Sequence, residues 1–295
     1  MGTGVRIGKL VIIGVGLIGG SFALALKRAG QVDHVVGVGR SVRNLERAIE
    51  LGVIDACEHD AGLAVRDADL VLVATPVGQM GGVFDAIAAH LPPRAIVTDA
   101  GSTKGDVALL MQRHLPCQLG YCVPAHPIAG SDLSGAAAAQ YGLFEHRTVV
   151  VAPLDTTLPD AVERVSDAWR TCGATVVAMA PADHDRVFAT VSHLPHLLAF
   201  SYVNSVASRP DAQRCLDFAS TGFRDFTRIA GSHPEMWRDI SLVNREALLA
   251  EIDAFSNELA ALRAELAAGD GDAMEARYRR ARAVRLDWFA RFQKR

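Results

Sequence analysis

Through the first 180 residues, short apolar runs alternate with stretches in which apolar positions recur every three or four residues. The apolar runs predict buried strands at 9–13, 34–38, 69–74, 95–98, 148–152 and 174–179. The helical spacing predicts helices at 21–29, 42–51, 83–90 and 159–170. Strands that alternate with helices in this way are typical of a mainly parallel sheet covered by helices, so we expect an α/β domain over residues 1–180.

The pattern changes near Pro181, after which no further strand is predicted. Residues 183–208 form one long, largely apolar helical pattern that contains Pro195. Two further helices are predicted at 244–268 and 272–292, with apolar positions at a period near 3.6. We therefore expect a second, all-α domain over residues 181–295.

Composition narrows the class of partner and the compartment. Half of the 295 residues are hydrophobic and the net charge is −3, so neither nucleic acid nor an anionic membrane is an expected partner. The five cysteines have irregular spacing and form no CxxC pair. This argues against a disulfide framework or a zinc site and favours the reducing cytoplasm.

A glycine motif joins the first predicted strand to the first predicted helix. Gly14, Gly16 and Gly19 form G-x-G-x-x-G. In this context the first glycine permits the turn, the second lets a pyrophosphate approach the backbone, and the third lets helix and strand pack closely. Leu17 and Ile18 begin the helix, whose free amides would face the phosphates. The motif predicts a Rossmann-type dinucleotide site.

The end of the second strand bears on the choice of cofactor. An acidic residue there would bind the ribose hydroxyl of NAD, but the sequence is Gly39-Arg40-Ser41-Val42-Arg43. Arg40, Ser41 and Arg43 suit a 2′-phosphate, because guanidinium groups match phosphate geometry. We therefore prefer NADP and leave NAD open. Thr75, at the end of the third strand, is a further candidate contact with the cofactor.

Polar motifs follow the later strands. Ser102 lies in D-A-G-S-T-K-G and His126 in H-P-I-A-G-S-D, both where the ligand crevice of such a sheet is expected. The two histidines in S-H-L-P-H have a spacing that occurs in metal sites. No carboxylate or thiolate lies at ligand spacing from them, so no metal is expected. A hydrolase triad is disfavoured because the chain has no G-x-S-x-G elbow.

Five motifs, in order, resemble the prephenate dehydrogenase family, which includes arogenate and cyclohexadienyl dehydrogenases. They are G-V-G-L-I-G-G-S, D-A-G-S-T-K-G, H-P-I-A-G-S-D, H-D-R-V-F-A-T-V-S-H-L-P-H and G-F-R-D-F-T-R-I-A, and the match spans about residues 9–245. The resemblance implies a homodimer formed through the helical domain, and a site in the cleft between domains. It also implies NAD(P)-dependent oxidative decarboxylation of prephenate or arogenate in tyrosine biosynthesis.

The resemblance also implies residue roles. His126 would accept the proton of the substrate hydroxyl, and Ser102 would hydrogen-bond His126 beside the nicotinamide. Arg228 would bind the ring carboxylate. His196 would contact the substrate side chain, His184 would support the cleft, and Asp132 would help to close the site.

Two other classes remain open at this point. A two-domain dehydrogenase of 3-hydroxy acids generally relies on a lysine in its helical domain, and no lysine occurs between Pro181 and Val243. A non-catalytic dinucleotide sensor would not need His126, Ser102 and Arg228 together. Prephenate carries a keto group on its side chain where arogenate carries an amino group, and no motif in the sequence distinguishes the two substrates.

Overall fold

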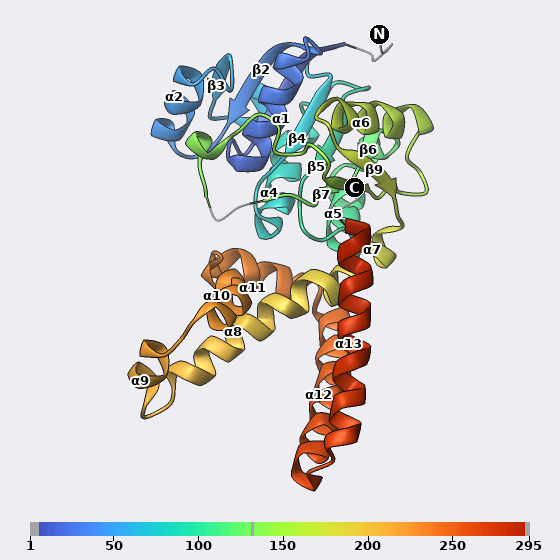
Figure 1. Cartoon of the computed structure of the whole chain (residues 1–295). Coiled ribbons are helices and arrows are strands. Elements are labelled where there is room, and N and C mark those ends of the chain that lie inside the picture. The colour runs from blue at the N-terminus through green and yellow to red at the C-terminus, as the bar shows by residue number, and fades with distance from the viewer. Residues whose placement is uncertain (1–5, 131–132, 293–295) are drawn as a thin grey trace. The chain divides into compact units, whose positions relative to one another are not determined.

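The computed structural model describes residues 6–130 and 133–292, and its first part is built on a six-stranded sheet (Figure 1). All neighbouring strands in this sheet are parallel, in the order β3-β2-β1-β4-β5-β6. The strands are β1 (Ile7–Ile13), β2 (Val32–Val38), β3 (Ala56–Glu58), β4 (Leu70–Val73), β5 (Ile96–Asp99) and β6 (Cys122–Val123). This order, with its switch point beside β1, confirms the predicted Rossmann-type domain.

Helices cover both faces of this sheet because the strand residues alternate between two apolar cores. Leu10 and Ile12 of β1 belong to one core, and Val11 and Ile13 belong to the other. Phe22 and Trp169 contribute to the first core, and their rings lie 4.5 Å apart. The helices of this part are α1 (Leu17–Arg28), α2 (Val42–Glu50), α3 (Ala61–Ala64), α4 (Val77–Ala88), α5 (Gly105–His114) and α6 (Pro159–Thr171). Short 3₁₀ segments lie at η1 (Pro116–Tyr121) and η2 (Ala136–Ala138).

A second, three-stranded sheet carries the first candidate catalytic residue. It consists of β7 (Ala125–Pro127), β8 (Thr148–Val151) and β9 (Thr175–Ala178). β7 pairs with β8 in antiparallel fashion, with His126 opposite Val150, and β8 pairs with β9 in parallel. The sequence predicted β8 and β9, but it did not predict β3, β6 or β7, which have two or three residues each.

The predicted long helix at 183–208 is divided. α7 (Pro181–Phe188) leads into a π-helical turn, η3 (Ala189–His193), and then into α8 (Leu194–Ala207). Pro195 lies in the first turn of α8. Proline has no amide hydrogen to give to the preceding turn, so a local change of helical pitch is expected there. The remaining elements are α9 (Ala212–Asp217), α10 (Thr221–Thr227), η4 (Arg228–Gly231) and α11 (Pro234–Val243).

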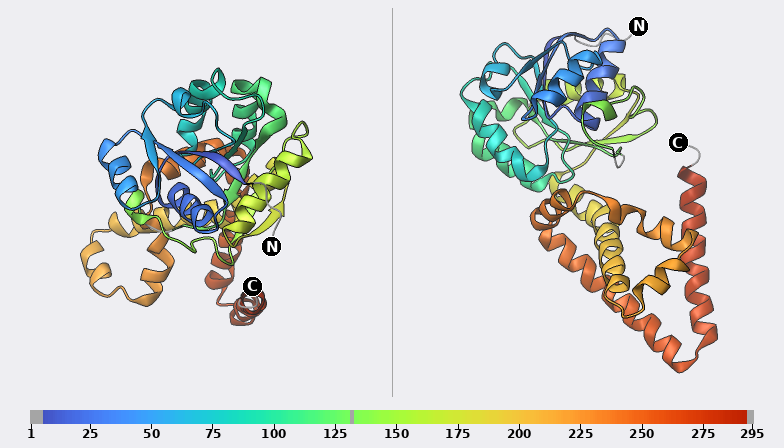
Figure 2. Two further views of the ribbon diagram at one scale, coloured as in Figure 1. Left: turned by 90° about the horizontal axis from the view of Figure 1, so that it is seen from above. Right: turned by 90° about the vertical axis from the view of Figure 1, so that its left-hand side faces the viewer.

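The chain divides into two compact units, Met1–Arg245 and Glu246–Arg295. The first unit thus contains α7 to α11 together with the Rossmann-type sheet. The boundary near residue 180, taken from the sequence, stays a prediction. The second unit holds nearly all of α12 (Arg245–Ala268) and all of α13 (Gly271–Phe292), which diverge from a tight turn at Gly269–Asp270 (Figure 2). Across this hairpin, Arg277 forms ion pairs with Glu258 and Glu265. Within the described residues, no helix is long and apolar enough to cross a membrane.

Candidate active site

A cleft of about 910 Å³ opens where β1, β2 and β4 end, and the glycine motif forms its floor. Gly14 has φ +102°, and a Cβ there would lie 2.7 Å from the Ala74 carbonyl oxygen. A Cβ on Gly19 would lie 2.6 Å from the Gly14 carbonyl oxygen. A Cβ on Gly16 would meet nothing within 4 Å, so the backbone there faces open space. These are the three roles predicted for the motif: turn, close packing and ligand approach.

Two further observations fit a dinucleotide. Among the residues that the structure describes, no side chain caps the N-terminus of α1, and its first turn carries no acidic residue, so its free amides can receive a pyrophosphate. Leu17 and Ile18 of this turn line an adjoining cavity of about 400 Å³. The Thr75 side chain lines both cavities, and its buried Oγ1 has no hydrogen-bond partner among the described residues. A buried hydroxyl without a partner is costly, so it suits a site that a polar ligand completes.

At the end of β2 the lining of the cleft has no acidic side chain among the described residues. Arg40 and Ser41 line it, whereas Arg43 does not. Ser41 also caps α2, because its side chain accepts a hydrogen bond from the Asn44 amide. Asn44 joins the glycine motif to the start of η2: its side chain donates to the Val15 carbonyl at 2.7 Å and accepts from the Ala136 amide at 2.8 Å.

The adjoining cavity brings the glycine motif and the candidate catalytic residues together. Gly16, Thr75, Ser102 and His126 all line it. No hydrogen bond joins the side chains of Ser102 and His126 among the described residues, so that contact stays a prediction. The Nδ1 atom of His126 instead lies 2.8 Å from Nε2 of His184.

A hydrogen-bonded chain runs from His126 through His184 to Asp185. The His184 ring is fully buried, and its Nδ1 lies 2.8 Å from Oδ1 of Asp185. An ionised carboxylate can only accept, so Nδ1 of His184 donates to it and Nε2 of His184 accepts. His126 must then donate from its own Nδ1, which leaves its Nε2 as a free acceptor. The chain therefore selects the tautomer of His126 that a proton acceptor needs.

Asp185 is held in the ionised form by the start of α5. Burial alone would raise its pKa, but hydrogen bonds from His184 and from the Lys104 and Gly105 amides outweigh burial and lower it. These amides donate at 2.7 and 2.8 Å, so Asp185 also caps α5. His184 was predicted to support the cleft and Asp185 was given no role, although an acid that directly follows a candidate histidine is visible in the sequence.

A buried ion pair supports the loop of Ser102 and the strand of His126. The Lys104 and Asp99 side chains are both fully buried and bonded to each other. Lys104 also donates to the Ala125 carbonyl at 2.8 Å, and Asp99 accepts from the Ala125 amide at 3.0 Å. The pair therefore fixes β7 against β5, one residue before His126.

His126 and His184, the two histidines of this hydrogen-bonded chain, are neutral near pH 7. Burial lowers the pKa of His126 well below 6.5, and the neighbouring His184 and Lys104 lower it further. Burial also lowers the pKa of His184, against the opposing effect of Asp185. His126 packs against Phe188, with the ring centroids 4.9 Å apart. A neutral, oriented imidazole with a free Nε2 can accept a proton from a substrate hydroxyl.

A third cavity, of about 540 Å³, also borders His126. Arg228 and His196 line it together with Trp237, so the structure brings these predicted residues to one place. The His196 ring stacks on Trp237 with 3.6 Å between centroids, and its Nδ1 donates to the Ser192 carbonyl at 2.9 Å. Burial and the nearby Arg228 lower the pKa of His196, while the Ser192 carbonyl opposes them. Asp132 lies outside the described residues.

Two other residues of this region were not predicted. Arg147 lines the same cavity as Arg228. The Asn244 side chain donates to the Asp185 carbonyl at 2.9 Å and to Nδ1 of the buried His193 at 3.0 Å. Neither lies in a motif, so only the fold places them at the site.

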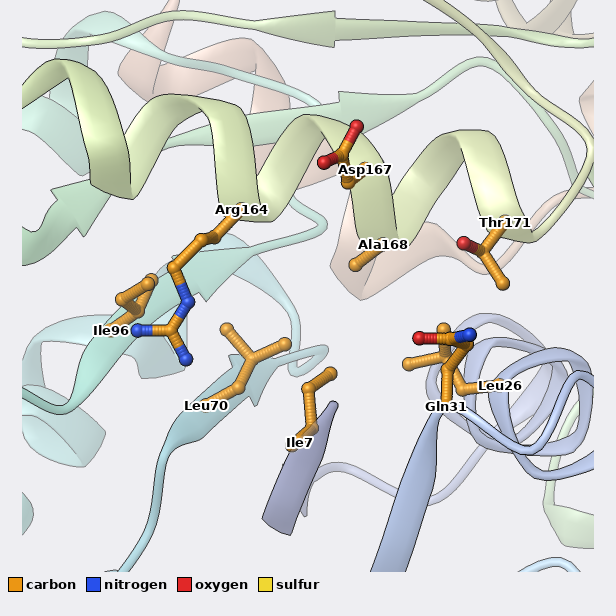
Figure 3. A pocket seen from close by; sticks show the side chains of 9 residues that line it. All are labelled: Ile7, Leu26, Gln31, Leu70, Ile96, Arg164, Asp167, Ala168 and Thr171. Atoms are coloured by element: carbon orange, nitrogen blue, oxygen red, sulfur yellow. The ribbon is translucent and has the colours of Figure 1, made fainter. Parts of the chain in front are cut away.

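A small hollow lies between the amino ends of the strands and helix α6 (Figure 3). Its volume is about 30 Å³, and it is lined by the apolar Ile7 and Leu70 and by the polar Arg164 and Gln31. A hollow of this size has room for only one or two water molecules. It is also at the opposite end of the strands from the glycine motif, so it does not belong to the candidate site.

The fold and the geometry of the cleft define a dehydrogenase that uses a nicotinamide dinucleotide. The family model described as "Prephenate dehydrogenase, nucleotide-binding domain" matches residues 22–178. The model described as "Prephenate dehydrogenase, dimerization domain" matches residues 180–279. The chain belongs to the prephenate dehydrogenase family.

Relatives with similar sequences and structures span most of the chain. Cyclohexadienyl dehydrogenase of Zymomonas mobilis is 37% identical over 94% of both chains. Prephenate dehydrogenase of Bacillus subtilis is 36% identical over 86% of this chain and 69% of its own length. The crystal structure of Aquifex aeolicus prephenate dehydrogenase with hydroxyphenyl propionate and NAD+ has a TM-score of 0.89 and 31% identity, covering 95% of this chain and 98% of that one.

Proposed function

We propose that this chain catalyses the oxidative decarboxylation of prephenate or arogenate with hydride transfer to NAD(P)+, a step of tyrosine biosynthesis. The observation that carries the proposal is the position of His126. Its ring lines both the cavity that contains the glycine motif and the cavity that contains Arg228. A substrate bound beside Arg228 therefore has its proton acceptor between itself and the dinucleotide cleft.

His126 would act as the proton acceptor. Its Nε2 would take the proton of the ring hydroxyl while the carbon bearing that hydroxyl loses hydride. The nicotinamide, when bound, supplies the hydride acceptor. Carbon dioxide then leaves from the opposite ring carbon, its bonding electrons complete the aromatic ring, and His126 can return the proton to the phenolate oxygen. His184 and Asp185 would keep Nε2 available, because Nδ1 is already committed to donating.

Arg228 and His196 would hold the substrate by its anionic end. A guanidinium stays protonated throughout the physiological range, so Arg228 suits a carboxylate that must be held in place until it leaves as carbon dioxide. His196 is neutral and fixed by stacking on Trp237, so it would contribute a hydrogen bond rather than a charge. Both residues line the cavity that His126 borders.

We propose NADP as the preferred cofactor. Support comes from Arg40 and Ser41, which line the cleft where the ribose of the adenosine would lie, and from the absence of an acidic side chain among its described lining residues. The nearest acid in the strand register, Glu58 opposite Val38, is engaged by the amides of His59 and Asp60.

We also propose a homodimer formed through the helical region, in the cytoplasm. The matched dimerization domain supports the dimer, as do the apolar side chains exposed along α13, which are Val284, Leu286, Trp288, Phe289 and Phe292. The five cysteines, all free, support a reducing compartment.

The experiment that tests the activity is a two-by-two assay of purified protein with prephenate or arogenate and with NAD or NADP. We expect reduced cofactor and carbon dioxide to appear in equal amounts with at least one substrate. Cofactor binding without turnover of either substrate would instead favour a dinucleotide sensor. Turnover of a 3-hydroxy acid alone would favour the other class of dehydrogenase.

A further inference from the structure

The cavity beside His126 carries a second cation besides Arg228. Arg147 lines it directly before β8, the strand that pairs with the strand of His126. The backbone of Arg147 is fixed on both sides: its amide donates to the Phe144 carbonyl at 3.0 Å, and its carbonyl accepts from the Thr175 amide at 2.8 Å. These two bonds fix the backbone from which the Arg147 side chain reaches the cavity.

The guanidinium of Arg147 has no other evident task. Within residues 6–130 and 133–292 its side chain forms no ion pair or hydrogen bond, and it is exposed. Some exposed arginines of the same unit are engaged, such as Arg170 with Glu163 and Arg186 with Asp183. Arg94 is exposed and unpaired among the described residues, as Arg147 is, but only Arg147 borders the cavity. An unpaired cation that borders a cavity is suited to bind an anionic ligand group.

The charge of the cavity distinguishes between the two candidate substrates. Arg228 and Arg147 supply two positive charges, and His196 is neutral because its pKa is lowered. No described residue that lines the cavity carries a carboxylate. Prephenate carries two carboxylates and no ammonium group, whereas arogenate adds an ammonium group that would need an acceptor and would be repelled by a nearby guanidinium.

We infer that Arg147 binds the side-chain carboxylate of the substrate, and that the cavity thereby selects the keto acid prephenate over the amino acid arogenate, an assignment that rests on the function proposed above. Arg228 holds the ring carboxylate and Arg147 the second one. The two guanidiniums fix both carboxylates, which sit on one ring carbon or its substituent, so the hydroxyl at the opposite ring carbon is directed to His126.

The first test compares Arg147→Gln with the wild type in steady-state kinetics. We expect KM for prephenate to rise about tenfold to a hundredfold with kcat nearly unchanged, since a charge-assisted contact made equally in ground and transition states is lost. Arg147→Lys should recover most of the loss. Arg94→Gln removes the same charge from an exposed position that does not line the cavity, and should leave KM unchanged. An unchanged KM in Arg147→Gln overturns the assignment.

The second test does not depend on turnover. Calorimetry with the cofactor-loaded enzyme compares 3-(4-hydroxyphenyl)propionate with the matching alcohol, which lacks the carboxylate. The wild type should bind the acid more tightly, and Arg147→Gln should bind both equally, with circular dichroism confirming the fold. If Arg147→Gln loses the same affinity for the acid as for the alcohol, or if the wild type binds both equally, the role of Arg147 is overturned.

The substrate preference is measured separately, as the ratio of kcat/KM for prephenate to kcat/KM for arogenate. The wild type should show a higher kcat/KM with prephenate than with arogenate, and Arg147→Gln should narrow that ratio. A wild-type preference for arogenate overturns the selection of the keto acid. If the wild type turns over neither substrate but still binds the acid through Arg147, the proposed reaction fails while the carboxylate site stands.

Discussion

At the scale of single residues, the sequence indicates which histidine matters but not how it is held. His126 stands out because a proline and a glycine flank it in the sequence and because it belongs to a motif shared with a family. Its hydrogen-bond partner His184 comes 58 positions later, and Asp185 then caps a helix about 80 positions earlier in the chain. No periodicity connects such positions, since they meet only when α7 packs beside α5.

Replacing His126 tests the proton acceptor. His126→Asn keeps an amide that can donate to His184 but removes the basic Nε2. We expect kcat to fall by about 10²–10⁴, the usual contribution of a general base, while the dissociation constant of the cofactor stays unchanged. Stopped assays of product formation and fluorescence titration with the reduced cofactor measure the two quantities. Wild-type turnover in this variant would remove His126 from the mechanism.

Replacing Arg228 tests the site of the ring carboxylate. Arg228→Ala should mainly raise KM, by about tenfold to a hundredfold, because it removes a charge-assisted contact present before the chemical step. The matched control is Arg209→Ala, an exposed arginine of the same helical region that pairs with Asp211. Steady-state kinetics that show the same KM for both variants would contradict the assignment.

The buried histidines also predict how stability depends on pH. The pKa values of His126, His184, His193 and His196 are all lowered, and that of His193 falls to about 4. The unfolded chain therefore binds more protons than the folded one between pH 6.5 and 4, so stability is full above pH 6.5 and falls as the pH decreases. His193 alone would contribute roughly 3 kcal/mol to this loss.

Urea unfolding at several pH values measures this dependence, with the free energy of unfolding extrapolated to water. The steepest fall should lie below pH 6.5, and the variant His193→Gln should show a shallower slope there. If the free energy of unfolding does not fall between pH 7 and pH 5 and His193→Gln leaves the slope unchanged, the pKa values of these rings are not lowered in the folded protein.

At the scale of elements, the sequence predicted the long strands with continuous apolar runs but not the strands of two or three residues. The long apolar runs of β1, β2 and β4 and the helices α1 and α2 are confirmed, whereas α3 was not predicted. β7 has only three residues, and it exists because β8 pairs with it and because the Lys104–Asp99 pair holds Ala125. The interruption near Pro195 follows from a missing amide hydrogen, but its form, a π-helical turn, depends on the packing around it.

The proposed preference for NADP is tested in the segment just before α2 and in its first turn. Arg40 lines the cleft and Arg43, three residues on, does not. We therefore expect Arg40→Gln to weaken binding of NADP by about tenfold or more and to change binding of NAD little, because only NADP carries the 2′-phosphate. Arg43→Gln serves as the matched loss of charge and should have a smaller effect. Fluorescence titration with each reduced cofactor measures both, and equal weakening of NAD and NADP by Arg40→Gln would rule out a 2′-phosphate contact.

At the scale of the whole molecule, the sequence predicted an α/β region followed by an all-helical region. It did not predict where the contacts within the folded chain would divide it into compact units. The overall charge of −3 also conceals a local surplus of positive charge, since Arg147 and Arg228 border one cavity. The two helices α12 and α13 were predicted from their apolar spacing, and the structure joins them in a hairpin. The surface that packs against these helices could not be predicted, because the sequence of an amphipathic helix shows that an apolar face exists but not what covers it.

The proposed dimer is tested by the apolar side chains of α13. Light scattering coupled to size exclusion should give twice the chain mass of 31.4 kDa for the wild type. Placing charges on the exposed apolar positions, as in Val284→Glu with Phe289→Glu, should shift the protein to the monomer mass, since an interface cannot bury unpaired carboxylates without a large cost. Arg282→Glu changes an exposed polar position of the same helix and should leave the dimer intact. A monomeric wild type, or a double variant that stays dimeric, would show that subunits do not pair through these residues.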